Sequence, residues 1–183
     1  MLVIISGPSG VGKGTLIRHL MKHPHFVYSV SATTRPPRPD EEDGTHYHFL
    51  SSEEFLDRIE AGDFLEYEEV FGHRYGTLRS TILQEEARGR HVILEIDVLG
   101  AEQVFSSDQE CVSIFLAPPS LEELRRRLEG RGTEDPQRLE LRLARAQDEI
   151  GRSDRYDIRI VNDDLAAAVE QAEAFLQNHL QIA

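Results

Sequence analysis

The stretch SGPSGVGKGTL, residues 6–16, decides the fold of this 183-residue chain. Two glycines and Lys13 follow the spacing G-x-x-x-x-G-K of a phosphate-binding loop, in which glycines let backbone N–H groups approach phosphate oxygens. That pattern normally continues with Ser or Thr, whose hydroxyl helps to hold magnesium. Here Gly14 follows, and the hydroxyl comes one place later on Thr15. The alternative interpretation is an ordinary glycine-rich turn between a strand and a helix.

Both flanks of the loop support the phosphate-binding interpretation. Residues 2–5, LVII, form a continuous apolar run that is typical of a buried parallel strand. Residues 15–23 place four apolar side chains on one helical face, and Pro24 ends that helix. Because the loop joins a strand to a helix N-terminus, its N–H groups and the helix dipole both favour an anion there.

Much of the chain repeats this alternation of strand and helix. Apolar runs predict further strands at residues 26–31, 91–96, 111–116 and 157–162, and a turn follows the second of these at 97–100. Helical spacing and end signals predict helices at residues 120–130, 136–151 and 165–180. The alternation predicts an α/β fold, a parallel sheet flanked by helices.

One segment interrupts that alternation, which divides the chain into a core and an insertion. Residues 33–89 are predicted to form an inserted subdomain, and the loop at 130–136 is predicted to be a small lid. Residues 1–32 and 90–183 then form the core of a single domain, which is what a chain of 183 residues supports.

Within the insertion, residues 32–50 contain three prolines and are predicted to have no regular structure. A capping box predicts that a helix starts at Ser51, and Gly62 ends it. Two strands are predicted within 64–77, and a helix at 78–89.

Composition restricts the function classes. The chain carries 20 basic and 33 acidic side chains, a net charge of −13, which disfavours general nucleic-acid binding. Cys111 is the one cysteine, so no internal disulfide is possible, in keeping with a reducing compartment. The opening MLVII is too short for a signal-peptide core, and no apolar run reaches the ~20 residues of a membrane span. We expect a cytoplasmic protein without membrane or nucleic-acid partners.

Two carboxylates end the strand predicted at 91–96. Ligands of open parallel sheets bind beyond the carboxyl ends of the strands, so Glu95 and Asp97 are candidates for an outer-shell metal site. The alternative is that they cap a helix. Since no hydroxyl follows Lys13, magnesium would be held mainly by nucleotide phosphates and water. The paired histidines lack the spacing and further ligands of a zinc site, and we expect no metal at His19, His23, His46 and His48.

The segments beyond the loop resemble guanylate kinases, in order and over essentially the whole chain. They are SATTRPPRPDEEDGTHYHF (31–49), FLEYEEVFGHRYGT (64–77), ILEIDVLG (93–100), IFLAPPS (114–120), RRRLEGRGTE (125–134) and IVNDDL (160–165). The resemblance implies a P-loop nucleoside-monophosphate-kinase fold with a GMP-binding subdomain and a lid. It also implies transfer of the γ-phosphoryl group of ATP to GMP, and to dGMP, with Mg²⁺, in purine nucleotide metabolism.

The resemblance also implies roles for individual residues. The phosphate loop and one distant asparagine would bind ATP: Gly7, Pro8, Ser9, Gly10, Val11, Gly12, Lys13, Gly14, Thr15 and Asn162. The insertion and its neighbours would bind GMP: Ser31, Arg35, Arg38, Glu41, Tyr47, Glu66, Tyr75, Thr77 and Asp97. Within this set, Glu66 and Thr77 would read guanine. Lys13, Arg131 and Arg142 would be catalytic.

Four positions depart from the family pattern: Gly14, Ala32 and Thr77, where serine is common, and Glu95, where aspartate is frequent. The first and last leave the metal arrangement open. Other assignments keep a local alternative. Arg35 and Arg38 suit a phosphate, because guanidinium forks bind its oxygens in pairs, but they could equally pair with Asp40, Glu41 or Glu42. Glu66 belongs to an acidic run with Glu68 and Glu69, and without the resemblance this pattern predicts a surface residue.

Several arginines precede or lie on the helix predicted at 136–151. Arg138 and Arg145 are predicted to pair with Glu134, Glu140 or Glu149 on a solvated face, and Arg125–Arg127 to complement the end of their own helix. Two other functions remain open. Kinase-like scaffold domains bind phosphorylated peptides instead of nucleotides, although Lys13 argues against this, and a related kinase could use another nucleobase, although Glu66 argues against that.

Overall fold

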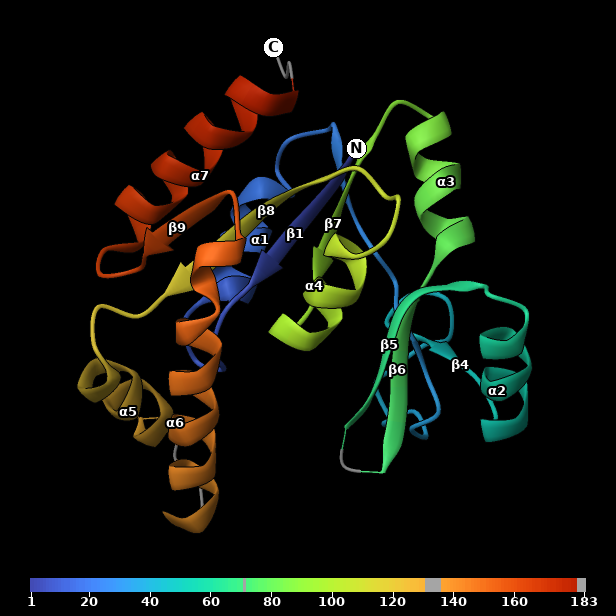
Figure 1. Ribbon diagram of the computed structural model, residues 1–183, viewed down its shortest axis with the longest axis horizontal. Coiled ribbons are helices and arrows are strands. Elements are labelled where there is room, and N and C mark those ends of the chain that lie inside the picture. Colours follow the sequence, from blue (N-terminus) through green and yellow to red (C-terminus); the bar gives the residue numbers. More distant parts are fainter. Residues whose placement is uncertain (71, 131–135, 181–183) are drawn as a thin grey trace.

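The core of the computed structural model is a five-stranded parallel sheet in the order β2-β7-β1-β8-β9 (Figure 1). The structure describes residues 1–70, 72–130 and 136–180. The strands of this sheet are β1 (Leu2–Ser6), β2 (Phe26–Tyr28), β7 (His91–Glu95), β8 (Cys111–Ala117) and β9 (Ile158–Val161). The α/β fold predicted from the alternating pattern is therefore confirmed.

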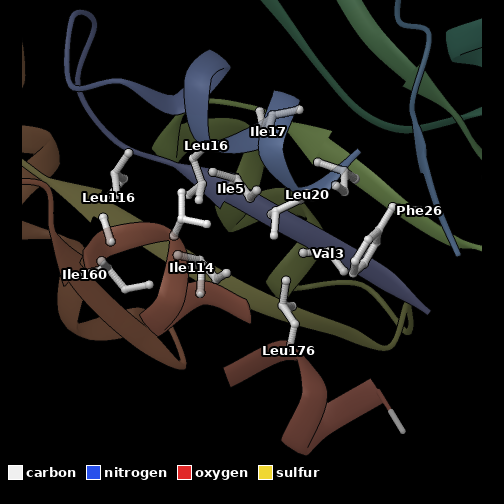
Figure 2. Packing of buried hydrophobic residues seen from close by; sticks show 14 of the residues in the cluster. Val3, Ile5, Leu16, Ile17, Leu20, Phe26, Ile114, Leu116, Ile160 and Leu176 are labelled. Atoms are coloured by element: carbon white, nitrogen blue, oxygen red, sulfur yellow. The ribbon is translucent and has the colours of Figure 1, made fainter. Parts of the chain in front are cut away.

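Alternate residues of β1 face opposite layers of helices, as the period of two in a strand requires. Val3 and Ile5 pack with α1 (Lys13–Leu20) and α7 (Leu165–Leu180), as Figure 2 shows for side chains from these elements. Leu2 and Ile4 pack on the other face with α3 (Arg79–Ala87) and α4 (Val98–Phe105). All four β1 side chains have no exposed area, and burying each fully contributes roughly 1.5–3 kcal/mol. This burial fixes the strand from which the phosphate loop emerges.

A second sheet of four strands has the order β4-β3-β6-β5. Its strands are β3 (Ala32–Thr33), β4 (His48–Phe49), β5 (Phe64–Val70) and β6 (His73–Leu78), and α2 (Ser52–Glu60) covers it. Phe55 of α2 stacks on Phe64 with ring centroids 4.3 Å apart, and Ala32 and Leu78 complete this small core. The antiparallel β5–β6 hairpin projects beside α4, and Leu65 of β5 packs into the main core. The second sheet is thus anchored to the first.

Helices α5 (Leu121–Glu129) and α6 (Pro136–Gly151) pack on each other through a leucine cluster, and a short 3₁₀ helix η1 (Ser153–Arg155) follows. In Figure 1, α6 and the β5–β6 hairpin lie on opposite sides of α4. Among the described residues, no helix is long and apolar enough to cross a membrane.

Most predicted elements form, and the differences have local causes. The helices predicted at 136–151 and 165–180 match α6 and α7, and the capping box at Ser51 is complete. The turn predicted at 97–100 is wrong, because Asp97 caps the start of α4. The loop predicted at 32–50 is wrong at its ends, where β3 and β4 pair with each other.

The ends of three elements also differ from what their sequence signals indicate. The helix predicted at 15–23 ends at Leu20, and the strand predicted at 26–31 ends at Tyr28. At the start of α5 the Ser120 hydroxyl accepts the N–H of Glu123, as a capping box requires. The Glu123 carboxylate, however, pairs with Arg126 and Arg127 of the same helix.

Candidate active site

The loop between β1 and α1 adopts backbone torsions that glycine tolerates best. Gly7, Gly10 and Gly12 have φ values of 144°, 85° and 107°. A Cβ at Gly7 would lie 2.1 Å from the carbonyl oxygen of Leu116, and one at Gly12 would lie 2.5 Å from Asn162 Nδ2. Side chains at these positions would therefore displace the loop. Successive peptide units in such conformations at a helix N-terminus form a concavity that binds anions.

The Lys13 ammonium lies over this loop. Its Nζ donates to the carbonyl oxygens of Gly7 at 2.6 Å and Pro8 at 3.3 Å, and it is 3.8 Å from Glu95 Oε1 at the end of β7. The side chain is 15% exposed, so the charge is held at the mouth of the loop rather than in bulk water. This is the position from which a lysine can neutralise terminal phosphates.

Another long-range contact reaches the loop from α6. Arg142 of α6 donates from Nη1 to Ser9 Oγ at 3.2 Å, which brings this predicted catalytic arginine to the phosphate loop. Arg131, the other predicted catalytic arginine, lies outside the described residues, as does most of the predicted lid.

Asn162, predicted to bind ATP, is buried beneath the loop. Its Nδ2 donates to the carbonyl oxygen of Val11 at 2.7 Å. The backbone carbonyl oxygen of Asn162 accepts from Arg127 Nη2 at 3.0 Å, and Arg127 Nε donates to Glu123 at 2.9 Å. Asn162 therefore supports the loop, and Arg127 does more than complement the end of its helix. The sequence pattern gave no signal for this link between α5 and the residue after β9.

A cleft of about 200 Å³ opens beside the loop, between the two sheets. It gathers five residues of the predicted GMP set and the predicted metal residue Glu95, together with side chains that the sequence did not single out. The five are Ser31, Tyr47, Glu66, Tyr75 and Asp97, and the others include Tyr28, His46 and Glu68.

Glu66 is the most buried carboxylate of this cleft. It is 6% exposed, and Thr77, which is fully buried, donates from Oγ1 to Glu66 Oε1 at 2.6 Å. The other oxygen, Oε2, lies against Gly100 of α4, where a Cβ would be only 2.9 Å away. Burial raises the pKa of Glu66 to about 7, with a contribution from the Asp97 charge, against the hydrogen bond from Thr77. The interpretation of Glu66 as a surface residue is therefore wrong.

The loop that carries Arg35 and Arg38, called the arginine loop below, forms hydrogen bonds and an ion pair with its own Glu41. Arg35 Nη1 and Nη2 each lie 2.9 Å from an oxygen of Glu41, and the backbone N–H of Arg38 donates to the same carboxylate at 2.8 Å. This hydrogen bonding holds the pKa of Glu41 well below its usual value. The Arg35 guanidinium also lies 5.4 Å from the ring centroid of Tyr47, and Tyr75 packs edge-on against Tyr47. The pairing with Glu41 that the sequence left open thus exists in the structure.

Asp97 occupies the junction between β7 and α4. Its Oδ1 accepts from the N–H groups of Leu99 at 3.0 Å and Gly100 at 2.9 Å, so the helix-capping alternative is confirmed for Asp97, whereas Glu95 is the last residue of β7. Its Oδ2 accepts from Arg145 Nη2 at 2.5 Å. Burial alone would raise the pKa of Asp97, but hydrogen bonds from Glu68 and Gly100 and the Arg145 charge lower it.

The prediction that Arg145 only pairs along a solvated helix face is therefore wrong. It does contact Glu149 Oε1 at 3.0 Å, as predicted, but it also reaches Asp97 and lies 3.9 Å from Glu68 Oε1. Helical spacing shows which side of α6 faces α5 but not what lies opposite the other side.

The donors available to a metal are oxygens at the end of β7. Both Asp97 oxygens are engaged by α4 and Arg145, whereas Glu95 faces Lys13 and lines the cleft. No group of three or more metal-ligating side chains occurs among the described residues. A carboxylate beside a phosphate loop suits Mg²⁺, which prefers few protein oxygens and retains water. Glu95 therefore fits an outer-shell role better than Asp97 does.

Comparison with known proteins gives a consistent result. The guanylate kinase family model matches residues 1–179. A guanylate kinase from Nostoc sp. is 49% identical over 176 residues, 96% of this chain and 88% of that relative. One from Gloeobacter violaceus is 50% identical, with 96% and 86% covered. The solved guanylate kinase of Anaplasma phagocytophilum matches with a TM-score of 0.74 and 33% identity, covering 100% of this chain and 87% of that one. The chain belongs to the guanylate kinase family.

Proposed function

We propose that the phosphate loop and the adjacent cleft carry out the family reaction, transfer of the γ-phosphoryl group of ATP to GMP to give ADP and GDP. The observation that carries this proposal is the pair Glu66–Thr77, buried and hydrogen-bonded at 2.6 Å in the cleft beside Lys13 and its loop. A chain that kept the fold without the reaction would have no need of a desolvated carboxylate there, because burying one is unfavourable without a ligand or partner.

The Glu66 pair suits guanine. Guanine offers N1–H and an exocyclic amine side by side, and an ionised carboxylate accepts both donors, while the Thr77 hydroxyl can turn to the O6 acceptor. Adenine presents a lone pair at N1, so its binding would leave buried groups unpaired. Sites of this kind reject the wrong partner by roughly 10⁴-fold. Asp97, held by α4 and Arg145, lies close enough to Glu66 to contribute to the same edge of the base.

The GMP phosphate belongs at the arginine loop. Glu41 pairs with the Arg35 fork in the two-point geometry that a phosphate would use. A dianion arriving between Arg35, Arg38, Tyr47 and Tyr75 would replace or join that carboxylate. Ser31 adds a further hydroxyl at the same cleft. The pairing with Glu41 orients the Arg35 guanidinium.

The ATP phosphates belong at the glycine loop, where Lys13 and Arg142 would share the charge that develops as the phosphoryl group moves. Mg²⁺ would neutralise phosphate oxygens and would be held by those oxygens and water, with Glu95 in its outer shell. The acceptor is itself a phosphate, so no strong general base is needed. We assign residues 33–89 as the GMP-binding subdomain and 130–136 as the lid, both of which would close to exclude water. We place the protein in the cytoplasm.

A coupled assay of ADP formation tests this function. With ATP and Mg²⁺ present, ADP formation should depend on GMP, and EDTA should abolish it. Nucleotide titration separates the binding-module alternative, which predicts weak or absent ATP binding. ATP consumption that GMP does not stimulate, in protein that binds both nucleotides, would exclude the proposal.

A substitution behind Glu66 tests the guanine assignment. In Gly100→Ala the new Cβ would lie 2.9 Å from Glu66 Oε2 and displace the carboxylate. We expect KM for GMP to rise about 10-fold, since small displacements of positioned groups have effects of this size or larger, with KM for ATP unchanged. Gly151→Ala is the control, because a Cβ there would meet nothing within 4 Å. Equal KM values for GMP in both variants would show that Glu66 does not need this close approach.

A further inference from the structure

Arg145 joins three parts of the molecule that are distant in sequence. It lies on α6, its Nη2 is 2.5 Å from Asp97 Oδ2 between β7 and α4, and the same atom is 3.9 Å from Glu68 Oε1 on β5. Its Nε donates to Glu149 Oε1 at 3.0 Å, one turn further along α6. The Arg145 guanidinium is therefore bound through Nε to its own helix and through Nη2 to Asp97, which lines the cleft.

The carboxylates that it meets are crowded. Glu66, Glu68 and Asp97 line one cleft. Their side chains are largely shielded, with Asp97 21% and Glu68 23% exposed. Like charges this close disfavour one another's ionisation, and burial adds to that effect. Accordingly the pKa of Glu68 is raised, by burial and by Asp97, while Arg145 acts in the opposite direction.

Asp97 has no freedom to turn while both of its oxygens are engaged. Oδ1 accepts from two N–H groups of α4 and Oδ2 accepts from Arg145, so the plane of the carboxylate is set by α4 and α6 together. Charge-assisted hydrogen bonds of this kind are about twice as strong as neutral ones. Asp97 in turn acts electrostatically on Glu66, which is the residue assigned to guanine.

From this arrangement we infer that Arg145 is a positioning residue for GMP, which keeps Asp97 oriented and offsets its charge so that guanine meets an ordered acceptor edge. The inference rests on the proposed function and extends it to a residue on the lid-bearing helix. Arg145 does not touch the phosphate loop through its described contacts, so its effect belongs to acceptor binding rather than to phosphoryl transfer.

The test compares three variants of the full chain by steady-state kinetics. For Arg145→Ala we expect KM for GMP to rise about 10-fold, the size expected for loss of a hydrogen bond to a charged group. Both kcat and KM for ATP should change by less than about 2-fold, because Arg142 and Lys13 remain. Arg145→Lys should restore part of the GMP affinity. Arg138→Ala removes the same charge from an exposed position two turns earlier on α6 and should leave all three parameters unchanged.

A second substitution distinguishes positioning from helix stability. If Arg145 acts through Asp97, Arg145→Ala should raise KM for GMP by less than 2-fold when it is added to Asp97→Asn, as coupling in a double-mutant cycle. Partial unfolding would lower the apparent kcat but not raise KM for GMP alone, so the KM ratio is informative even for a less stable variant. A KM for GMP within 2-fold of wild type, a loss confined to kcat, or an equal effect of Arg138→Ala would each overturn the inference. Absence of GMP-dependent turnover in the wild type would instead overturn the proposed function.

Discussion

Replacing Lys13 with alanine is expected to lower kcat by about 10³-fold, the scale seen when one preorganised group that stabilises transition-state charge is removed. This ammonium donates to the carbonyl oxygens of Gly7 and Pro8 and faces Glu95, which holds it at the mouth of the phosphate loop. Phosphoryl transfer depends on charge neutralisation rather than on a covalent residue, so removing this charge acts directly on the transition state.

Two control substitutions test whether the loss of kcat is specific to the Lys13 side chain. Lys22→Ala removes an equivalent charge from an exposed position just after α1 and should leave kcat unchanged. Gly14→Ser should keep most of the activity, because a Cβ at that position would meet nothing within 4 Å. Such tolerance would support magnesium held by phosphates and water. If Gly14→Ser were as damaging as Lys13→Ala, the interpretation of this loop would be wrong.

Glu66→Gln should reduce kcat/KM for GMP by about 10³-fold, because the amide presents a donor to the N1–H and amine of guanine and leaves buried groups unpaired. Residual activity with other nucleoside monophosphates should not fall in parallel. Glu69→Gln is a matched control on the same strand, where the side chain is 60% exposed and pairs only loosely with Arg74 at 3.7 Å. An equal loss for every acceptor would refute the assignment of Glu66 to base recognition.

Comparing Glu66→Gln with the wild type also isolates the effect of pH on KM for GMP. Burial raises the pKa of Glu66 to about 7, so a growing fraction is protonated as the pH falls below that value and can no longer accept both guanine donors. KM for GMP in the wild type should therefore rise toward pH 6. The GMP phosphate also titrates near pH 6, but it does so with either protein. The ratio of KM for Glu66→Gln to KM for wild type should shrink from pH 8 to pH 6, and a constant ratio would contradict a role for Glu66 ionisation.

The phosphate loop and the main sheet could be predicted because their signals are local. Leu2–Ser6 is apolar throughout, and the glycines that follow are needed for backbone torsions that the loop itself requires. α4 was missed because it is short and contains Gly100, which lowers helix propensity. Burial of Val98 and Val104 against the sheet and the Asp97 cap stabilise it instead. Tertiary packing thus decided an element for which local preference was weak.

The arginines show which parts of the candidate site could not be predicted from the sequence. Arg142 could be assigned from the resemblance, but the pattern of α6 gives Arg145 the appearance of a solvated residue. Its partner Asp97 is 48 residues earlier in the chain and is brought close only by the tertiary fold, which places the start of α4 opposite Arg145 of α6. In the same way, the bond from Arg127 to the carbonyl of Asn162 joins residues 35 apart. Side-chain partners at such separations depend on the tertiary fold, which no local pattern records.

The most direct measurement is the initial rate of ADP formation from ATP and Mg²⁺ with GMP, AMP, CMP or UMP as the only acceptor. If the cleft reads guanine through Glu66 and Thr77, GMP should exceed each of the others in kcat/KM by about 10³–10⁴-fold. Comparable rates with AMP and GMP, or no stimulation by GMP, would contradict the account.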